Sequence, residues 1–409
     1  MATTQRNAFN TPIQWSLIKT AGIAACLTLY QLALSLFVNG GSFDRLTQWD
    51  VAWYRSVADV GYNVKLPLES MQDHASNIAF FPGFPIWMKG FMTLFGMSSL
   101  RAAPFSAHIA YTGFWIYFFF ILKRLGVSAA VGIFLAFFLI CQPGAFYFVT
   151  GYSESFFSFM IAGFIYWTMK TFEDRNASVL FFLLAALHGI AMTATRFVGF
   201  PLVAYPLFIA LLKFPRIRES IPRFAQAVLL STVSLAGVLS FFAYCHWVWG
   251  KWDLHFEALR VGWVVSPGIE KFLTLEYYKF AFFSGDLADN IGRVCTWVAF
   301  YFSLRFCVRA WKSPSLGAFP KSLTYFAFFY LCEMIVVSHG VRSMVRYLLP
   351  VYVVLFPVVG REIQQMLDDG RKMEILTPAK IILVIALVLL LQALQAEFIN
   401  RYAAASWVA

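Results

Sequence analysis

A carboxylate in the first polar segment, Asp50, is the residue best placed to do chemistry. It belongs to the sequence QWDVAWYR at residues 48–55 and follows the first long apolar run, 15–38, by twelve residues. A carboxylate that is partly desolvated beside the ring of Trp49 can act as a general base. An ordinary loop or helix-capping aspartate would have the same local spacing. Spacing alone therefore leaves both interpretations open.

Arginines later in the chain could hold an anion. Arg342 and Arg346 stand four residues apart, so in a helix their guanidinium groups share one face, which suits the binding of a phosphate. Arg196 lies at the end of a further apolar run, in the sequence TATRF at 193–197. Snorkelling interfacial arginines are the alternative for the pair. Because acids nearly balance basic residues on the predicted outer face, we favour an anion site.

Two acids lie in or beside apolar runs. Glu154 opens such a run within the sequence YSES at 152–155, where it could serve chemistry or only favour the dipole of the helix that follows. Glu333 falls inside a later run. An ionisable group at that depth is costly and commonly faces an interior cavity, although a neutral acid bonded to a neighbouring helix is equally consistent with its position.

The composition describes the protein that must position these side chains. Of the 409 residues 60% are hydrophobic and 13% are charged, and the mean hydropathy is +0.68, far more apolar than a soluble domain with about 25% charged residues. The net charge is +11, but the basic residues lie in short clusters between apolar runs, which indicates membrane topology rather than nucleic-acid binding. The six cysteines show no paired spacing, so we expect small buried residues and neither a metal cluster nor a disulfide framework.

Eleven apolar runs have about the 17–25 residues that a helix needs to cross a bilayer. The predicted spans are 15–38, 103–122, 127–143, 152–169, 177–195, 198–213, 225–249, 291–309, 322–338, 347–361 and 379–398. The apolar stretch 78–100 is broken by Pro82 and Pro85, so we expect short helices at the outer surface there. The first span continues past a signal-peptide-like site, which favours an uncleaved helix.

The distribution of basic residues predicts the orientation. With the N-terminus inside, the inner segments hold 18 of the 32 Lys and Arg residues and seven acids, whereas the outer segments hold 14 basic residues and 13 acids. This asymmetry follows the positive-inside rule. It places a first outer loop at 39–102 and a second large outer loop at 250–290 in a single polytopic domain that covers 1–409.

Several segments in this order resemble the PIG-V family, the second mannosyltransferase of GPI-anchor assembly. The resemblance rests on Trp49-Asp50, Gly61-Tyr62, AFFPGFP at 79–85, QPGA at 142–145 and GYSES at 151–155. The sequence TRFVG at 195–199 is similar to a further arginine motif of the family, and the C-terminal half contributes mainly RYLLP at 346–350.

The resemblance implies an all-α integral membrane glycosyltransferase of the GT-C type. Such an enzyme takes a sugar, here most simply mannose, from a polyprenyl phosphate and inverts the anomeric centre. Asp50 would then be the general base. We further assign the binding of the donor phosphate to Arg342, Arg346 and Arg196, an assignment that is ours and not the family's. The residues expected to line the sugar or acceptor pocket are Trp49, Trp53, Tyr54, Asn77, Tyr152 and Glu154.

Three expectations complete this interpretation. Trp53 stands where eukaryotic relatives carry a histidine, so any role of that imidazole is absent here. The short outer loops and compact length are typical of a bacterial protein, so we expect an inner-membrane enzyme that acts on the periplasmic side on a lipid or glycan acceptor. The first outer loop contains no Asp-x-Asp, which predicts no metal or other cofactor, with a divalent cation left open. The alternatives are a flippase or transporter of lipid-linked sugars and a non-catalytic binder of them.

Overall fold

A computed structural model describes residues 16–68, 75–173, 179–214, 217–263, 285–313, 316–337, 343–370 and 377–406, with the side chains of 217–219 left aside. All regular structure in these ranges is helical. In chain order the α-helices and the short 3-10 helices (η) are α1 (Leu17–Val38), η2 (Asp44–Leu46), α2 (Asp50–Val60), η5 (Asn77–Ala79), α3 (Gly83–Phe95), α4 (Ser99–Arg124), α5 (Ala129–Ile140), η6 (Ala145–Phe148), α6 (Glu154–Glu173), α7 (Val179–Thr193), η7 (Phe197–Gly199), η8 (Pro201–Ala204), α8 (Tyr205–Lys213), α9 (Ile217–Ser234), α10 (Ala236–Trp249), α11 (Leu254–Trp263), α13 (Leu287–Lys312), α14 (Ala318–Val337), α15 (Met344–Asp368) and α17 (Pro378–Ala403).

The expected all-α membrane architecture is confirmed, with fewer long spans than the eleven predicted. Each predicted span contains helix, and within the described residues seven helices are long and apolar enough to cross a membrane: α1, α4, the α9–α10 pair from Ser220, α13, α14, α15 and α17. The run 127–143 contains only the 12 residues of α5, a rise of about 18 Å against a hydrocarbon core of about 30 Å. The run 198–213 is divided into η7, η8 and α8, with prolines at Pro201 and Pro206.

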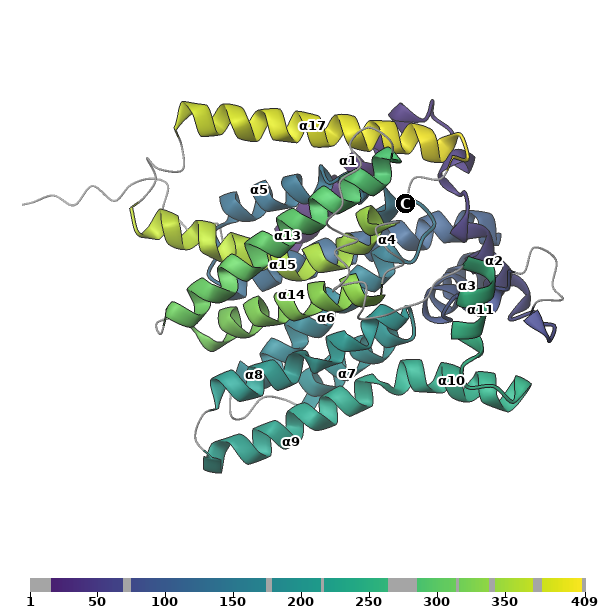
Figure 1. Cartoon of the computed structure of the whole chain (residues 1–409), viewed down its shortest axis with the longest axis horizontal. Helices are drawn as coiled ribbons and strands as arrows, with labels where there is room; N and C mark the ends of the chain where they lie inside the picture. The colour runs from purple at the N-terminus through teal and green to yellow at the C-terminus, as the bar shows by residue number, and fades with distance from the viewer. Residues whose placement is uncertain are drawn as a thin grey trace, which may run out of the picture.

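Burial separates central from peripheral helices. In the most apolar window of α15, 83% of the residues are buried, against 22% for α1 and 11% for α17. α15 packs against α5, α6, α13 and α14, in the middle of the bundle, while α17 runs along one edge and α9 with α10 along the opposite edge (Figure 1). Since apolar side chains cover α17 on nearly all sides, its exposed surface suits contact with lipid.

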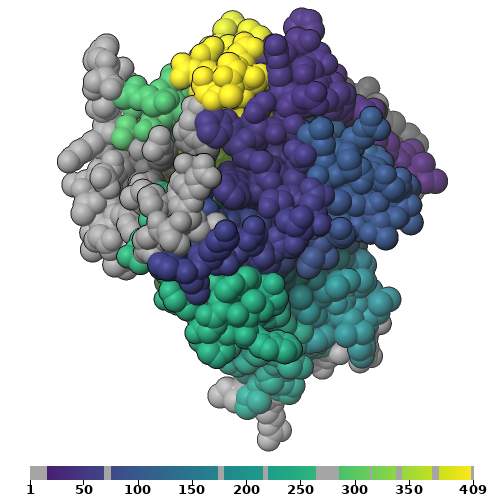
Figure 2. All heavy atoms as spheres, turned by 90° about the vertical axis from the view of Figure 1, so that its right-hand side faces the viewer, coloured from purple at the N-terminus to yellow at the C-terminus, as the bar shows by residue number. Residues whose placement is uncertain are grey.

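The segment 39–102 gathers at one end of the bundle. It contains η2, α2, η5, α3 and the first turn of α4. We call this the loop end, defined by α2, α3 and α11, which lie together on the right of Figure 1. Figure 2 faces the loop end and shows α17 above the first segment and α10 with α11 below it. Of the second expected loop, 250–290, the structure describes α11 and the start of α13, and residues 264–284 lie outside the described ranges.

Candidate active site

Four charged side chains from distant parts of the sequence form one buried cluster at the loop end, which we call the charged cluster: Asp50, Glu154, Arg196 and Arg346. Arg346 Nη1 donates to Asp50 Oδ2 at 2.6 Å, and Arg346 Nε lies 3.5 Å from Glu154 Oε1. Arg196 Nη1 donates to the same Glu154 oxygen. The four side chains are between 1% and 15% exposed. Two carboxylates and two guanidinium groups thus balance in charge where water is largely excluded.

Local helix signals place these residues. Asp50 is the first residue of α2 and Glu154 the first of α6, where the unpaired N–H groups and the helix dipole stabilise an acid. Arg346 lies in the first turn of α15 and Arg196 directly precedes η7. Glu154 therefore both stands at the N-terminus of a helix, where the dipole favours an acid, and pairs with two arginines.

The backbone before Asp50 is strained. Trp49 has φ +56° and ψ −117°, a left-handed value that is rare for a residue with a side chain. Conformations of this kind persist where the surrounding structure holds them, and they concentrate at functional sites. Tyr402 on α17 supplies part of that support, because its hydroxyl donates to Gln48 O at 3.0 Å and accepts from Gln48 N at 3.1 Å.

Aromatic rings enclose both guanidinium groups. The Arg346 guanidinium carbon lies 5.4 Å from the ring centres of Tyr152 and Tyr347 and 5.7 Å from that of Tyr147. The Arg196 guanidinium lies 5.6 Å from the ring of Tyr347, so Tyr347 is shared by the two cations. Contacts of this kind are worth roughly 0.5–2 kcal/mol each and hold the guanidinium planes in fixed positions.

Two glycines of the quoted motifs permit backbone contacts next to the arginines. A Cβ on Gly83 would lie 2.7 Å from Ala194 O, and the Gly83 N–H donates to that oxygen at 2.7 Å. A Cβ on Gly144 would lie 2.5 Å from Val345 O. Since neither carbonyl can give way cheaply, these positions need glycine, and they fix the chain immediately before Arg196 and Arg346.

The charged cluster retains unused hydrogen-bonding capacity. In the described part of the chain, Glu154 Oε2 and Arg346 Nε are buried and make no hydrogen bond. Nearly all buried polar atoms in folded proteins have a partner, and a buried polar atom without one costs about 1–3 kcal/mol. A ligand with both donor and acceptor groups could satisfy these atoms.

Two of the predicted pocket residues touch the charged cluster. The Tyr152 hydroxyl accepts from the Asp50 N–H at 3.4 Å. The Tyr54 hydroxyl is 2.7 Å from Ser153 Oγ, which in turn is 3.5 Å from Arg196 Nη1. Burial raises the pKa of Tyr54 above its usual value, with Glu154 adding to the effect, so this hydroxyl stays protonated.

The remaining predicted residues have other surroundings. Trp49 is 40% exposed beside the cluster. Trp53, one turn after Asp50 on α2, stacks on Phe80 with ring centres 6.0 Å apart and meets Trp263 edge-on at 5.8 Å. Trp53, Phe80 and Trp263 thus form one group of contacting rings.

Asn77 belongs to a structural clamp and not to the charged cluster. Its amide donates to Ser56 Oγ at 3.1 Å and to Gly61 O at 3.0 Å, and its carbonyl accepts from the Asn63 N–H at 3.1 Å. These bonds engage the whole amide in closing the end of α2. Arg342 lies outside the described residues.

Sequence reasoning did not single out three residues that support the cluster: Ser153, Tyr147 and Tyr402. Ser153 lies inside the quoted GYSES motif, so the motif could have identified it. Tyr402 comes from the last helix and has no local signal. Within the described residues no group of three or more His, Cys, Asp and Glu side chains could hold a metal ion, and independence from a metal or other cofactor stays a prediction.

Neither a protein-family model nor a curated protein matches this chain. Solved structures do. The crystal structure of ArnT from Cupriavidus metallidurans bound to undecaprenyl phosphate aligns with a TM-score of 0.51 at 14% identity, over 93% of this chain and 76% of ArnT. The archaeal oligosaccharyltransferase AglB from Archaeoglobus fulgidus, in complex with an inhibitory peptide and a dolichol-phosphate, aligns with a TM-score of 0.50 at 13% identity, over 96% of this chain and 56% of AglB.

An oligosaccharyltransferase from Archaeoglobus fulgidus tethered with an acceptor peptide gives a TM-score of 0.51 at 13% identity, over 97% of this chain and 55% of that chain. The chain therefore spans about three quarters of ArnT and little more than half of AglB. At such low identity the likeness establishes the fold alone: the bundle has the fold of GT-C membrane glycosyltransferases.

Proposed function

We propose that this protein is a membrane glycosyltransferase that moves a sugar, most simply mannose, from a polyprenyl phosphate to a hydroxyl of a lipid or glycan acceptor. The observation that carries the proposal is the buried ion pair between Arg346 and Asp50, 2.6 Å apart, at the loop end of a GT-C fold. The ligands named for the similar structures, undecaprenyl phosphate and dolichol-phosphate, support a polyprenyl phosphate donor. The resemblance to the PIG-V family supports mannose.

In this proposal Asp50 is the general base. Its carboxylate takes the proton of the acceptor hydroxyl while the hydroxyl oxygen bonds to the sugar C1. The bond from C1 to the lipid phosphate breaks, its electron pair leaves with the phosphate, and the configuration at C1 inverts. Proton transfer to a positioned group of this kind contributes roughly 10²–10⁴-fold to the rate.

Arg346 and Arg196 stabilise the departing phosphate. Negative charge grows on the phosphate oxygens in the transition state, and fixed guanidinium donors in a site of low dielectric stabilise that charge strongly. Arg342, by its spacing from Arg346, remains a third candidate for this role. The loop end would face the periplasm from the inner membrane, as the basic-residue distribution predicts.

The position of Arg346 adds an order to these events. In the unliganded site Arg346 Nη1 occupies Asp50 Oδ2 at 2.6 Å. A donor phosphate competes for the same guanidinium donors. Once the phosphate draws Arg346 away, the Asp50 oxygen is free to accept the proton of the acceptor hydroxyl, which couples its availability to the presence of donor.

The decisive experiment measures sugar transfer from radiolabelled polyprenyl-phosphate-mannose by purified protein in membrane extract. Asp50→Asn should lose at least 100-fold in turnover while it still binds donor. The matched control is Asp44→Asn, an exposed acid six residues earlier. Wild-type turnover by Asp50→Asn would refute the role of Asp50 as the general base. Donor binding without turnover in either protein would favour a transporter or a different sugar.

A further inference from the structure

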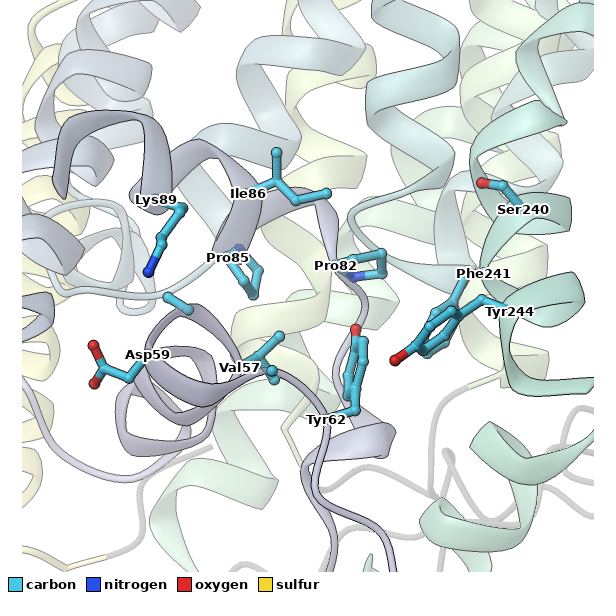
Figure 3. Close-up of a pocket in the computed structure, with 12 residues that line it drawn as sticks. Val57, Asp59, Tyr62, Pro82, Pro85, Ile86, Lys89, Ser240, Phe241 and Tyr244 are labelled. Carbon is cyan, nitrogen blue, oxygen red and sulfur yellow. The ribbon is translucent and has the colours of Figure 1, made fainter. Parts of the chain in front are cut away.

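A second feature of the loop end lies at the opposite end of α2 from Asp50. A cavity of about 500 Å³ opens between α2, α3 and α10, and Figure 3 shows the side chains that line it. Asp59 on its wall is nine residues after Asp50, a rise of about 13 Å along the helix. The cavity is therefore separate from the charged cluster.

The cavity has one charged side and one aromatic side. Asp59 and Lys89 lie together on one side, and Tyr62, Phe241 and Tyr244 lie on the other (Figure 3). Tyr62 uses its hydroxyl to donate to Phe80 O at 2.8 Å, so it presents its ring to the cavity. The charged and aromatic sides together suit an amphipathic ligand with a charged head group.

The two charges are available and opposite in sign. Ser99 Oγ donates to Asp59 Oδ2 at 2.7 Å and accepts from Arg55 Nε at 3.2 Å, which fixes the carboxylate and leaves its second oxygen without a hydrogen bond from the described residues. Lys89 forms no ion pair with any described residue and is exposed. One cation and one anion thus face the cavity from adjoining helices.

The surroundings of the cavity are apolar and exposed. Ile86 and Leu94 on α3 are 66% and 73% exposed, and Leu239 and Trp247 on α10 are 54% and 88% exposed. α10 forms the second half of a helical pair long and apolar enough to span a membrane. Large exposed apolar side chains beside a polar pocket are typical of a membrane contact. Acyl chains could therefore lie against α3 and α10 while a head group enters the cavity.

We propose that this cavity binds a zwitterionic phospholipid with a primary ammonium, phosphatidylethanolamine in chemical class. The phosphate pairs with Lys89, and the ammonium donates to Asp59 on the same side of the cavity. An anionic head group would leave Asp59 unpaired, and a quaternary ammonium has no N–H to donate to it. This inference does not depend on the proposed sugar transfer.

The test titrates delipidated protein in detergent with short-chain phosphatidylethanolamine, phosphatidylglycerol and phosphatidylcholine and counts bound lipid by native mass spectrometry. The ethanolamine lipid should bind at least several-fold more tightly than the other two. Asp59→Asn keeps an acceptor for Ser99 but loses the charge, and Lys89→Gln loses the cation. Each should weaken ethanolamine-lipid binding about tenfold, the effect expected for loss of one charged hydrogen bond.

Two matched controls and one steric variant complete the design. Asp44→Asn and Lys65→Gln remove exposed charges of the same segment that do not line the cavity and should leave binding unchanged. Ser240→Phe puts a ring into the cavity from α10, where Ser240 is exposed, and should abolish binding without unfolding the protein. Equal binding of all three lipids, a preference for the anionic lipid, or full binding by Ser240→Phe would each overturn the proposal.

Discussion

Arg346 on α15 donates to Asp50 on α2 at 2.6 Å across 296 residues of sequence. The contact joins α2 of the loop end to α15, which has the largest buried share among the seven candidate spans. Glu154 continues the network from Arg346 to Arg196, so each carboxylate has at least one guanidinium partner. The four residues therefore respond to substitution as a unit, and effects on stability can be separated from effects on sugar transfer.

Removal of Arg346 alone should destabilise the protein strongly. Arg346→Met leaves Asp50 buried without its partner, and loss of one member of a buried ion pair costs about 3–5 kcal/mol. The double variant Asp50→Asn, Arg346→Met removes both charges and should recover a large part of that loss. Thermal unfolding of purified protein in detergent measures both, and a double variant less stable than Arg346→Met would contradict the pairing.

Glu154→Gln should change donor binding and turnover in opposite directions. The substitution leaves two guanidinium groups and one carboxylate, so the charged cluster becomes cationic and should bind polyprenyl phosphate several-fold more tightly. Turnover should fall, because Arg196 and Arg346 lose the anion that holds them together. Equilibrium binding and turnover are measured on the same preparation. The control is Glu257→Gln, which removes an acid of α11 that pairs with Lys251. Weaker donor binding by Glu154→Gln would refute the expectation.

Gly144→Ala should displace Arg346 without touching its chemistry. The new Cβ would lie 2.5 Å from Val345 O, so the start of α15 must move, and we expect a lower melting temperature with at least a tenfold loss of turnover, since a misplacement of about 1 Å can cost 10²-fold. Gly90→Ala on α3 is the control because a Cβ there meets nothing within 4 Å. That change should be neutral or stabilising by up to about 1 kcal/mol. Equal behaviour of the two variants would show that the close approach is unimportant.

The packing of α11 against η5 should weaken in mild acid. Burial among Phe81, Phe241 and Phe256 lowers the pKa of His255 from 6.5 to about 4, although its Nδ1–H donates to Ile78 O at 3.3 Å. Between pH 6.5 and 4 the unfolded chain therefore binds a proton that the folded chain does not, and stability falls as the pH falls.

By pH 5 the protonation of His255 should lower the free energy of unfolding by about 2 kcal/mol. The difference in melting temperature between pH 7 and pH 5 measures it. His255→Phe has no group to protonate and fits the aromatic surroundings, so it should show a smaller difference than wild type. An unchanged difference in His255→Phe would show that other groups cause the acid sensitivity.

The sequence by itself determined the class of protein and most of the residues of the candidate site. Hydropathy is a local property, so the apolar runs located helices for all eleven predicted spans. In the stretch 78–100, α3 begins directly after Pro82 and contains Pro85 in its first turn. Glu154, Arg196 and Arg346 could be chosen because they stand at the ends of apolar runs, and Asp50 because it follows Trp49 in the first polar segment. Run length, however, overestimated α5, since the end of a helix depends on the turn that follows as well as on apolar content.

Only the tertiary structure decided which side chains meet. Sequence analysis predicted that Arg346 binds a phosphate and that Asp50 deprotonates an acceptor hydroxyl. In the structure the two side chains form an ion pair with each other. In the structure Asn77 donates a hydrogen bond to the backbone of Gly61, and Tyr402 of the last helix donates one to the backbone of Gln48. Such contacts depend on how whole helices and loops pack. The residues that they join are between 16 and 354 positions apart, so no periodicity or short motif contains them.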